Sequence, residues 1–399
     1  MASFSHSCCQ TSWDIQPSFR EPVRELAAYG YVLALAGSSP KLSLCPSTWN
    51  VANTLPLAMT NKVLVTGANG FVGRETCTAL ADLNISVRRA VRSLSPEGSP
   101  LNELHGAHSP AQEICRVGDI GESTDWSKAL DGISVVVHLA AHVHVMKKSS
   151  ARALTEFHRV NTAGTEQLAR AAVRAGVRRF IYLSSAGVNG RSTNGRPFTE
   201  TDVPHPHDAY TMSKWAAEQK LQTIANDSAL EIAIIRPPIV YGPGEPGNFM
   251  RLVRLVDSGL PLPFGVIQGR RSLIYVRNLV NAIITCAKHP GAAGQTFLVS
   301  DGEDVSTLEL IYRVADALGR RATLIPFPLS CLRVLGRLTG KSKQLNALLA
   351  SLVIDSSRIR RELAWNPPCS MADGLQETAD WYLARKRPQA SSRLVLVHK

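Results

Sequence analysis

The stretch KVLVTGANGFVG, residues 62–73, decides the fold of this chain. An apolar run leads directly into a glycine-rich turn, and the turn opens a segment with helical spacing. Gly67 permits a tight turn, Gly70 lets the backbone come close to a phosphate, and Gly73 lets the helix pack against the strand. The amide groups that begin such a helix favour negative charge. The stretch therefore predicts a dinucleotide-binding turn, although an ordinary strand-turn-helix corner has the same glycines and the later motifs must decide. The expected cofactor contacts in the turn are Gly67, Asn69, Gly70, Phe71, Val72 and Gly73.

Beyond this turn, short apolar runs alternate with amphipathic stretches, as in a series of βαβ units. Parallel neighbouring strands need long connections, and right-handed crossovers place helices on both faces of the sheet. The order therefore predicts a doubly wound parallel sheet. The expected strands are 62–66, 86–91, 114–118, 133–138, 179–184 and 231–236, and the expected helices are 71–83, 152–176 and 208–226.

The composition changes at Pro237, where loops rich in proline and glycine begin and short mixed elements follow. This change predicts a second, smaller domain for the substrate. Residues 271–276 look like a further strand that returns to the large sheet, so we expect the two domains to be partly interleaved. The predicted fold class is α/β, a Rossmann-type doubly wound parallel sheet with a smaller mixed α/β C-terminal substrate domain. The expected ranges are 59–240 for the dinucleotide-binding domain, 241–388 for the substrate domain and 389–399 for a basic tail.

Residues 1–58 differ from the rest of the chain. They are rich in polar and small residues, and their one apolar run, Tyr29 to Gly37, is too short to span a membrane and does not follow the pattern of a secretory signal. Met59 stands just before the first expected strand. We therefore expect residues 1–58 to be upstream sequence read as protein, or a poorly ordered extension.

The composition is that of a globular protein, with 399 residues of which 44% are hydrophobic and 19% charged. No run reaches the ~18 apolar residues of a membrane-spanning helix. The net charge of +12 favours acidic partners such as nucleotides, phosphosugars, nucleic acid or an anionic membrane face, and a solvated basic surface explains it equally well. The eight cysteines lack paired short spacing, which predicts neither a zinc site nor a disulfide framework and fits a cytoplasmic location.

Tyr210 and Lys214 lie four residues apart, so on a helix both side chains project from one face. A cation beside the phenol, supplied by Lys214 and by an oxidised nicotinamide ring, lowers the tyrosine pKa and lets it exchange a proton with a carbinol oxygen. Ser185 follows an apolar run, and the carboxyl ends of parallel strands face the ligand crevice. Ser185 can therefore hydrogen-bond the same oxygen. Each motif alone also fits an exposed helix face or a strand-end turn, and their order along the chain favours the catalytic interpretation.

In this order the motifs resemble the extended short-chain dehydrogenase/reductases, in the branch of nucleotide-sugar epimerases, dehydratases and reductases. The resemblance covers nearly all of residues 60–385 and is carried by VHLAA at 137–141, VNTAGT at 160–165 and RPPIVYG at 236–242 as well as by the glycine turn. The catalytic residues that it implies are Ser185, Tyr210 and Lys214. The further cofactor contacts that it implies are Asp119, Ile120, Leu139, Ala140, Ala141, Asn161, Tyr210, Lys214 and Pro237.

The substrate contacts implied by the resemblance are Ser185, Asn248 and Arg271. An arginine offers a diphosphate a planar bidentate partner, which suits Arg271, although a surface charge and an Asx turn are the competing interpretations of Arg271 and Asn248. Two departures from the family pattern weaken this assignment of substrate contacts. A long insert at 330–352 is interpreted as a helical pair packed on the small domain or as a membrane-surface helix, and Arg277 stands where the family often has aspartate. No metal ligands are expected.

The choice of cofactor depends on the end of the second strand. A site for NAD(H) has a carboxylate there, which binds the ribose hydroxyls. No Asp or Glu lies between Leu83 and Pro96, whereas Arg92 and Ser93 stand where a 2′-phosphate would lie. The sequence therefore favours NADP(H), with NAD(H) as the alternative.

The resemblance implies hydride transfer at C4 of a UDP-hexose or UDP-N-acetylhexosamine. The pattern is most similar to bacterial enzymes of cell-surface polysaccharide synthesis, among them UDP-glucose 4-epimerases and 4-reductases of UDP-4-keto-6-deoxy-N-acetylhexosamines. Because Arg92 favours NADP(H), we expect a 4-keto reductase, with a UDP-glucose or UDP-N-acetylglucosamine 4-epimerase as the alternative. The expected partner is a nucleotide sugar and not nucleic acid, and the resemblance implies a homodimer formed through the helices that begin near 152 and 208.

Three other functions fit the residues less well. A 4,6-dehydratase usually has acidic partners beside the catalytic serine or threonine, and Ala186 and Gly187 stand there instead. A 3β-hydroxysteroid-type dehydrogenase would need a sterol pocket, which the polar Asn248 and Arg271 do not suit. A dinucleotide-sensing regulator without turnover tends to lose the tyrosine, which this chain retains at position 210.

Overall fold

The computed structural model describes residues 62–93, 112–143, 151–263, 269–325, 328, 330, 337 and 350–386. The expectations for the N-terminal extension, for most of the insert at 330–352 and for the basic tail lie outside these residues. All structural statements below refer to the described part of the chain.

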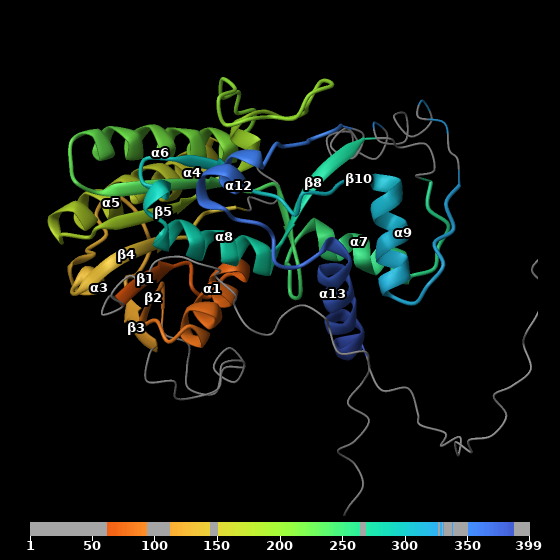
Figure 1. Cartoon of the computed structure of the whole chain (residues 1–399), viewed down its shortest axis with the longest axis horizontal. Coiled ribbons are helices and arrows are strands. Elements are labelled where there is room, and N and C mark those ends of the chain that lie inside the picture. Colours follow the sequence, from red (N-terminus) through yellow and green to blue (C-terminus); the bar gives the residue numbers. More distant parts are fainter. Residues whose placement is uncertain are drawn as a thin grey trace, which may run out of the picture. The chain divides into compact units, whose positions relative to one another are not determined.

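Seven parallel strands form the large sheet, in the order β3-β2-β1-β4-β5-β6-β9 (Figure 1). The chain moves outward from β1 to β3 and then continues with β4 on the other side of β1. The strand order thus reverses between β1 and β4, which is where open α/β sheets bind ligands at the carboxyl ends of their strands. The strands are β1 (Lys62–Thr66), β2 (Val87–Val91), β3 (Gln112–Arg116), β4 (Ile133–His138), β5 (Arg179–Leu183), β6 (Glu231–Arg236) and β9 (Thr296–Leu298).

Alternate side chains of the strands enter two separate cores. Val63 and Val65 of β1 pack with side chains of helices α1 and α8, whereas Leu64 packs with side chains of α3, α5 and α6 on the opposite face. Burial on both faces explains why the strands are nearly continuous apolar runs. The helices are α1 (Phe71–Asp82), α3 (Ser127–Leu130), α5 (Gly164–Arg174), α6 (Ala209–Asn226) and α8 (Val276–Lys288).

The helix expected over 152–176 contains a π-helical turn. It consists of α4 (Ala151–Phe157), the π-helix η1 (His158–Ala163) and then α5, with no break between them. Single π-helical turns inside α-helices are rare and frequently lie at functional sites. Here the turn carries Asn161, one of the predicted cofactor residues.

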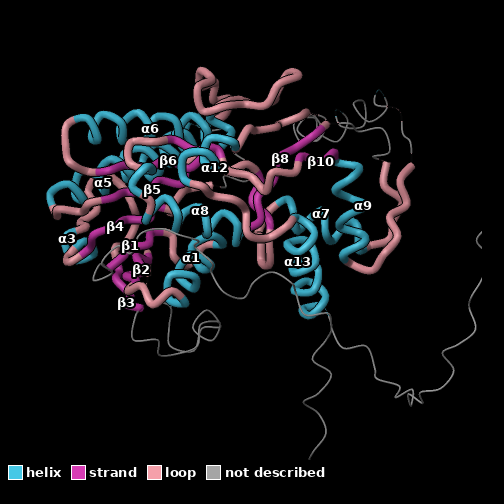
Figure 2. The backbone as a smooth tube through the Cα atoms, in the orientation of Figure 1, coloured by secondary structure: helices cyan, strands magenta, loops and turns pink. Residues whose placement is uncertain are grey.

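Three short strands form a second, mixed sheet in the order β10-β8-β7. Strand β7 runs parallel to β8, and β10 runs antiparallel to it. Helices α7, α9 and α13 gather around this sheet (Figure 2), and their apolar side chains form a core of their own. The elements are β7 (Ile239–Tyr241), β8 (Arg270–Tyr275), β10 (Asp304–Ser306), α7 (Asn248–Asp257), α9 (Thr307–Ala317) and α13 (Met371–Lys386).

The strand expected at 271–276 does not return to the large sheet, so this expectation is wrong. It corresponds to β8, which pairs with β7 and β10, whereas the large sheet is completed by β9 beside β6. An apolar run indicates that a strand is buried but not which sheet it joins. The remaining described elements are η2 (Ala186–Val188), η3 (Pro290–Ala292) and α12 (Ser357–Leu363).

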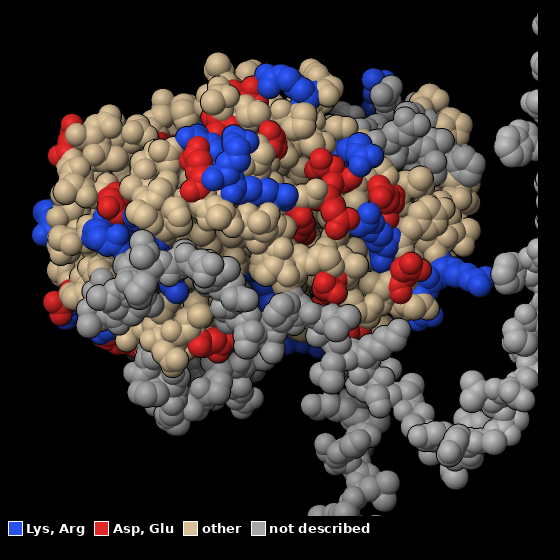
Figure 3. Space-filling view, viewed as in Figure 1, with Lys and Arg blue, Asp and Glu red and all other residues tan. Residues whose placement is uncertain are grey.

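Basic and acidic side chains lie close together on the face shown in Figure 3. Described ion pairs of this kind include Arg358–Glu362 at 2.8 Å and Arg313–Glu303 at 2.7 Å. Cys369 takes part in a disulfide bond, which the scatter of cysteines did not predict. Within the described ranges, no helix combines the length and the hydropathy needed to cross a membrane.

Candidate active site

The glycine-rich turn between β1 and α1 has close backbone contacts that side chains would block. Gly67 has a φ of 68°, and the Gly70 amide donates to the Gly67 carbonyl at 2.8 Å. A Cβ at Gly73 would lie 2.0 Å from that same carbonyl oxygen, and a Cβ at Gly67 would lie 2.7 Å from the Ala140 nitrogen. These two positions therefore accept only glycine without a shift of the backbone. The turn packs closely against the segment after β4. Its glycines have no side chains that would block a phosphate.

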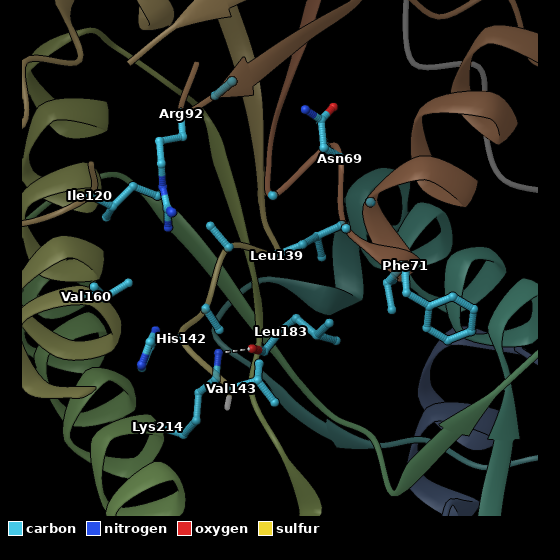
Figure 4. Close-up of a pocket in the computed structure, with 18 of the residues that line it drawn as sticks. Asn69, Phe71, Arg92, Ile120, Leu139, His142, Val143, Val160, Leu183 and Lys214 are labelled. Carbon is cyan, nitrogen blue, oxygen red and sulfur yellow. Dashed lines mark hydrogen bonds between the residues drawn. The ribbon is translucent and has the colours of Figure 1, made fainter. Parts of the chain in front are cut away.

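A cavity of about 1010 Å³ is bounded by this turn and by the carboxyl ends of β1, β2, β4 and β5. Figure 4 shows Asn69 and Arg92 at one end of it and Lys214 at the other. All three predicted catalytic residues line the cavity, and so do all predicted cofactor contacts except Asn161. The structure thus brings together, in one place, residues that are spread from 67 to 237 in the sequence.

Lys214 reaches this cavity from the first half of α6 and is only 2% exposed. Its Nζ atom donates to the Leu183 carbonyl at 2.8 Å and lies 4.7 Å from the centre of the Tyr182 ring. Burial lowers the pKa of Lys214 to about 7, and the nearby Glu218 carboxylate opposes this decrease. The lysine can therefore change its charge near neutral pH.

Tyr210 lies one turn before Lys214 on α6, and the centre of its ring is 5.9 Å from the lysine Nζ atom. Phe157 packs against the tyrosine ring, with a distance of 6.3 Å between the ring centres. Burial raises the pKa of Tyr210 to about 12, with a further contribution from Asp208. The residues of the chain therefore favour the protonated phenol. The lowering of this pKa by Lys214 together with an oxidised nicotinamide stays a prediction.

Ser185 lies two residues after the end of β5 and is the N-cap of the short helix η2. Its Oγ atom accepts a hydrogen bond from the Gly187 amide at 3.1 Å, which fixes the side chain at the cavity wall. A Cβ at Gly187 would lie 2.7 Å from the Thr211 side chain. The absence of a side chain at residue 187 thus lets the end of β5 approach the start of α6, where Tyr210 is located.

Asn161 supports the cavity from behind instead of lining it. Its Oδ1 atom accepts from the His142 amide at 2.7 Å, while its Nδ2 atom donates to the His142 carbonyl and to Ser213 Oγ, both at 3.0 Å. The asparagine is 1% exposed. It therefore ties the segment after β4 to helix α6 next to the predicted catalytic residues.

Two arginines, one within β2 and one just after it, lie near the glycine turn, and the second of them lines the cavity. Arg92 pairs with Asp119 at 2.9 Å, and both side chains are largely exposed, at 78% and 68%. Arg89 Nη2 donates to Asn69 Oδ1 at 3.0 Å. Both predicted residues, Arg92 and Asp119, are thus in place beside the turn, and Arg89 is a neighbouring cation that the sequence analysis did not single out.

The two predicted substrate residues from the small domain do not line the cavity. Asn248 is exposed and begins α7, where its Oδ1 atom accepts from Arg251 Nη1 at 3.2 Å. Arg271 Nη2 donates to the Ala350 carbonyl at 3.2 Å. Glu245 lines the cavity instead, and its carboxylate accepts from the amides of Gly247 and Met250 at the start of α7. The substrate roles of Asn248 and Arg271 remain predictions.

The profile of the NAD dependent epimerase/dehydratase family matches residues 63–300, which is more than half of the chain. The chain belongs to this family. The resemblance to extended short-chain dehydrogenase/reductases is thereby confirmed.

The relatives of this chain and the solved structures similar to it have names that refer to different activities. A Vibrio cholerae protein named UDP-glucose 4-epimerase is 43% identical over 328 residues, covering 82% of this chain and 96% of that protein. A Mycobacterium tuberculosis protein named 3 beta-hydroxysteroid dehydrogenase/Delta 5-->4-isomerase is 33% identical over 275 residues, covering 65% of this chain and 70% of that protein. Among solved structures, MoeE5 in complex with UDP-glucose and NAD has a TM-score of 0.65 at 27% identity, covering 82% of this chain and 100% of that chain.

Several residues that line the cavity in this member of the epimerase/dehydratase family belong to none of the sequence motifs. His142 and Val143 directly follow the VHLAA segment, so their position after β4 could have predicted that they line the cavity. Glu245 and Pro246 lie in the loop before α7, where the sequence shows only a change of composition. The other lining residues that the motifs did not single out include Glu156, Arg159 and Leu183.

Proposed function

We propose that this protein moves hydride at C4 of a UDP-linked hexose or N-acetylhexosamine, and that it acts as an NADP(H)-dependent 4-keto reductase. One observation carries the proposal: Ser185, Tyr210 and Lys214 converge on a single cavity whose other end is the glycine turn. When bound, the nicotinamide cofactor would supply the hydride. The cavity offers room and a phosphate cradle for such a dinucleotide.

Each of the three residues has a separate task in this reaction. Tyr210 donates its phenolic proton to the C4 oxygen as the ketone becomes an alcohol. Lys214, as an ammonium beside the phenol, stabilises the phenolate that remains. Ser185 hydrogen-bonds the same oxygen and orients the substrate. Since burial keeps the pKa of Tyr210 high, the phenol is protonated at neutral pH, which is the form that a reductase needs.

The cofactor part of the proposal depends on Arg92. Its exposed guanidinium can leave Asp119 and bind a 2′-phosphate, and Arg89 adds positive charge beside Asn69. NAD(H) is the alternative, favoured by the NAD in the MoeE5 structure. Arg92→Ala should raise the KM for NADPH and leave the KM for NADH nearly unchanged. Equal effects on both would contradict the role of Arg92.

A 4-epimerase is the second candidate, and the Vibrio cholerae relative favours it. In that reaction Tyr210 would take the proton of the C4 hydroxyl and later return it, so the same three residues would serve both steps. A steroid dehydrogenase is a third candidate, favoured by the Mycobacterium tuberculosis relative.

The test is incubation of the purified protein with three sets of substrates. UDP-glucose and UDP-N-acetylglucosamine are each supplied with NAD⁺, a UDP-4-keto-6-deoxy-N-acetylhexosamine with NADPH, and a 3β-hydroxysteroid with NAD⁺. We expect stoichiometric NADPH consumption and a reduced sugar from the keto compound alone. Interconversion of the C4 epimers without net cofactor change would instead establish the epimerase, and oxidation of the steroid alone would overturn the sugar assignment.

A further inference from the structure

A buried ion pair lies behind the catalytic residues and is not part of the cavity wall. The Glu218 and Arg236 side chains are 3% and 4% exposed, and neither lines the cavity. Arg236 Nε donates to Glu218 Oε1 at 3.0 Å, and Arg236 Nη2 donates to Glu218 Oε2, so the pair is bidentate. Burying two charges costs free energy even when they pair well, and well-packed apolar side chains often stabilise a protein as much. Stability alone is therefore a weak reason for the pair.

The pair joins the elements that carry the active site. Glu218 also accepts a hydrogen bond from the hydroxyl of Ser184, the residue directly before Ser185. Arg236 ends β6, directly before Pro237 in the cavity wall, and its Nη1 atom donates to Asn189 Oδ1 at 3.0 Å. The carboxyl ends of β5 and β6 and helix α6 are thus tied together at one point.

Glu218 of this pair also affects the charge of Lys214. Glu218 lies one helical turn after Lys214, so both side chains project from one face of α6. Burial lowers the pKa of Lys214, and the Glu218 carboxylate raises it. His138 on β4 is fully buried, and burial together with Lys214 lowers its pKa to about 3, so it adds no charge at neutral pH. The titratable and charged groups that face Lys214 are Tyr210 and Glu218 of α6, Tyr182 of β5, His138 of β4 and, paired with Glu218, Arg236 of β6.

We propose that Glu218 and Arg236 are positioning residues of the active site: together they hold Ser185 in place through Ser184, and Glu218 favours the ammonium form of Lys214. The inference rests on the proposed function, because it concerns the same site. Neither residue touches the substrate or the cofactor. Both act through their neighbours.

The test compares Glu218→Gln with Arg236→Gln by steady-state kinetics at several pH values. Glu218→Gln removes the carboxylate that raises the pKa of Lys214, so the pH at which activity is lost as the pH rises should decrease by about one pH unit. Arg236→Gln leaves an unpaired carboxylate, so the same loss should move to higher pH. In both variants kcat should fall, while KM for the sugar changes by less than about twofold. Shifts in the same direction, or no shift in either variant, would overturn the inference.

Glu231→Gln is the matched control. Glu231 begins β6 and pairs with Arg179, whose side chain is 1% exposed, at the opposite end of the same two strands. This variant also leaves a buried arginine without its carboxylate, so it should lower the melting temperature without moving the pH dependence of kcat. A shift of that dependence in the control as large as in Glu218→Gln would also overturn the inference.

Ser184→Ala keeps both charges and removes only the hydroxyl that joins Glu218 to β5, so it serves if the ion-pair variants fail to fold. We expect kcat to fall about tenfold, an increase of about 1.4 kcal/mol in the activation free energy, with the melting temperature nearly unchanged. A wild-type kcat in this variant would overturn the positioning of Ser185. Wild-type turnover is measured first: a wild-type protein without turnover contradicts the proposed function, whereas an active wild type with unaffected variants contradicts only the positioning pair.

Discussion

At the residue scale, burial moves the pKa values of Tyr210 and Lys214 in opposite directions. The phenol is raised to about 12 and the ammonium is lowered to about 7, because removal from water disfavours the charged form of each group. Around neutral pH the site therefore holds a phenol that keeps its proton beside a lysine close to half ionised. A proton donor next to a cation of adjustable charge is suited to ketone reduction.

The first prediction concerns Tyr210. Tyr210→Phe removes only the hydroxyl, so kcat should fall by about 10²–10⁴-fold, the usual contribution of general acid catalysis. The affinity for NADPH, measured by quenching of its fluorescence, should stay within twofold of the wild type. A variant that binds the cofactor normally and retains wild-type kcat would exclude Tyr210 as the proton donor.

The second prediction concerns the pH dependence of stability. Because the pKa of Lys214 is lowered to about 7 from an ordinary 10.5, the unfolded chain holds this proton between those pH values while the folded protein has released it. The unfolded state then binds more protons, so stability rises with pH in that window. Below pH 7 the group is protonated in both states, so its cost to stability is fully present and does not change with pH. Lys214→Met lacks the effect. We expect the unfolding free energy of the wild type, relative to the variant, to increase from pH 7 to about pH 10 in urea titrations.

The control for this measurement is Lys220→Met, since Lys220 is an exposed lysine later on the same helix. Its difference from the wild type should stay nearly constant over the same range. A constant difference for Lys214→Met as well would mean that the lysine keeps an ordinary pKa in the folded protein.

At the element scale, the parts that follow from local pattern could be predicted, and the parts that depend on long-range packing could not. The strands at 62–66, 133–138 and 231–236 match their expected bounds, because a strand buried on both faces must be an apolar run. The glycine turn and the spacing of Tyr210 and Lys214 are equally local. Strand β9 has only three residues and no alternation, so nothing in the sequence marked it.

Contacts between distant residues left no such signal. Glu218 and Arg236 meet only because the chain returns from α6 to β6. Glu218 belongs to none of the motifs, and Arg236 opens the RPPIVYG segment, which does not indicate its partner. The resemblance implies that Asn161 supports the active site and contacts the cofactor. Its hydrogen bonds go to the backbone of His142 and to Ser213, and the cofactor contact stays a prediction. The π-helical turn that orients this side chain cannot be predicted from the spacing of apolar residues.

The third prediction concerns the turn between β1 and α1. Gly73→Ala would place a Cβ 2.0 Å from the Gly67 carbonyl oxygen, so the backbone of the turn must move. Overpacking of this kind costs about 1–3 kcal/mol of stability, and the displaced turn should bind NADPH more weakly. Isothermal titration of NADPH and a thermal melt measure the two effects.

Gly132→Ala is the control for this variant. Gly132 has a positive φ of 67°, unlike Gly73, and a Cβ there would meet no atom within 4 Å. It should lose about 1–2 kcal/mol from the left-handed backbone alone and keep its affinity for NADPH. If Gly73→Ala binds NADPH as tightly as Gly132→Ala does, the turn is not the phosphate cradle.

At the scale of the whole molecule, the large sheet and the small sheet are joined by a buried carboxylate. Asp301 lies three residues after β9 and accepts hydrogen bonds from the Tyr241 hydroxyl, the Tyr275 amide and the Asn278 amide group. Burial raises the pKa of Asp301 to about 6. These contacts fix the end of the large sheet to β7 and β8, so the small domain has a defined place relative to the cavity.

The fourth prediction concerns assembly through helices α4 and α6. These helices pack side by side, and each carries an exposed apolar side chain: Leu154 is 56% exposed and Met212 is 55% exposed. Large apolar side chains on adjacent helices suit a contact with a second copy of the chain. We expect the wild type to be a dimer by light scattering after size exclusion, and Leu154→Glu combined with Met212→Glu to be a monomer of 43.2 kDa. Leu260→Glu, a similar change at a 63% exposed leucine of the small domain, should leave the dimer intact. A monomeric wild type, or a double variant that remains dimeric, would exclude this face as the interface.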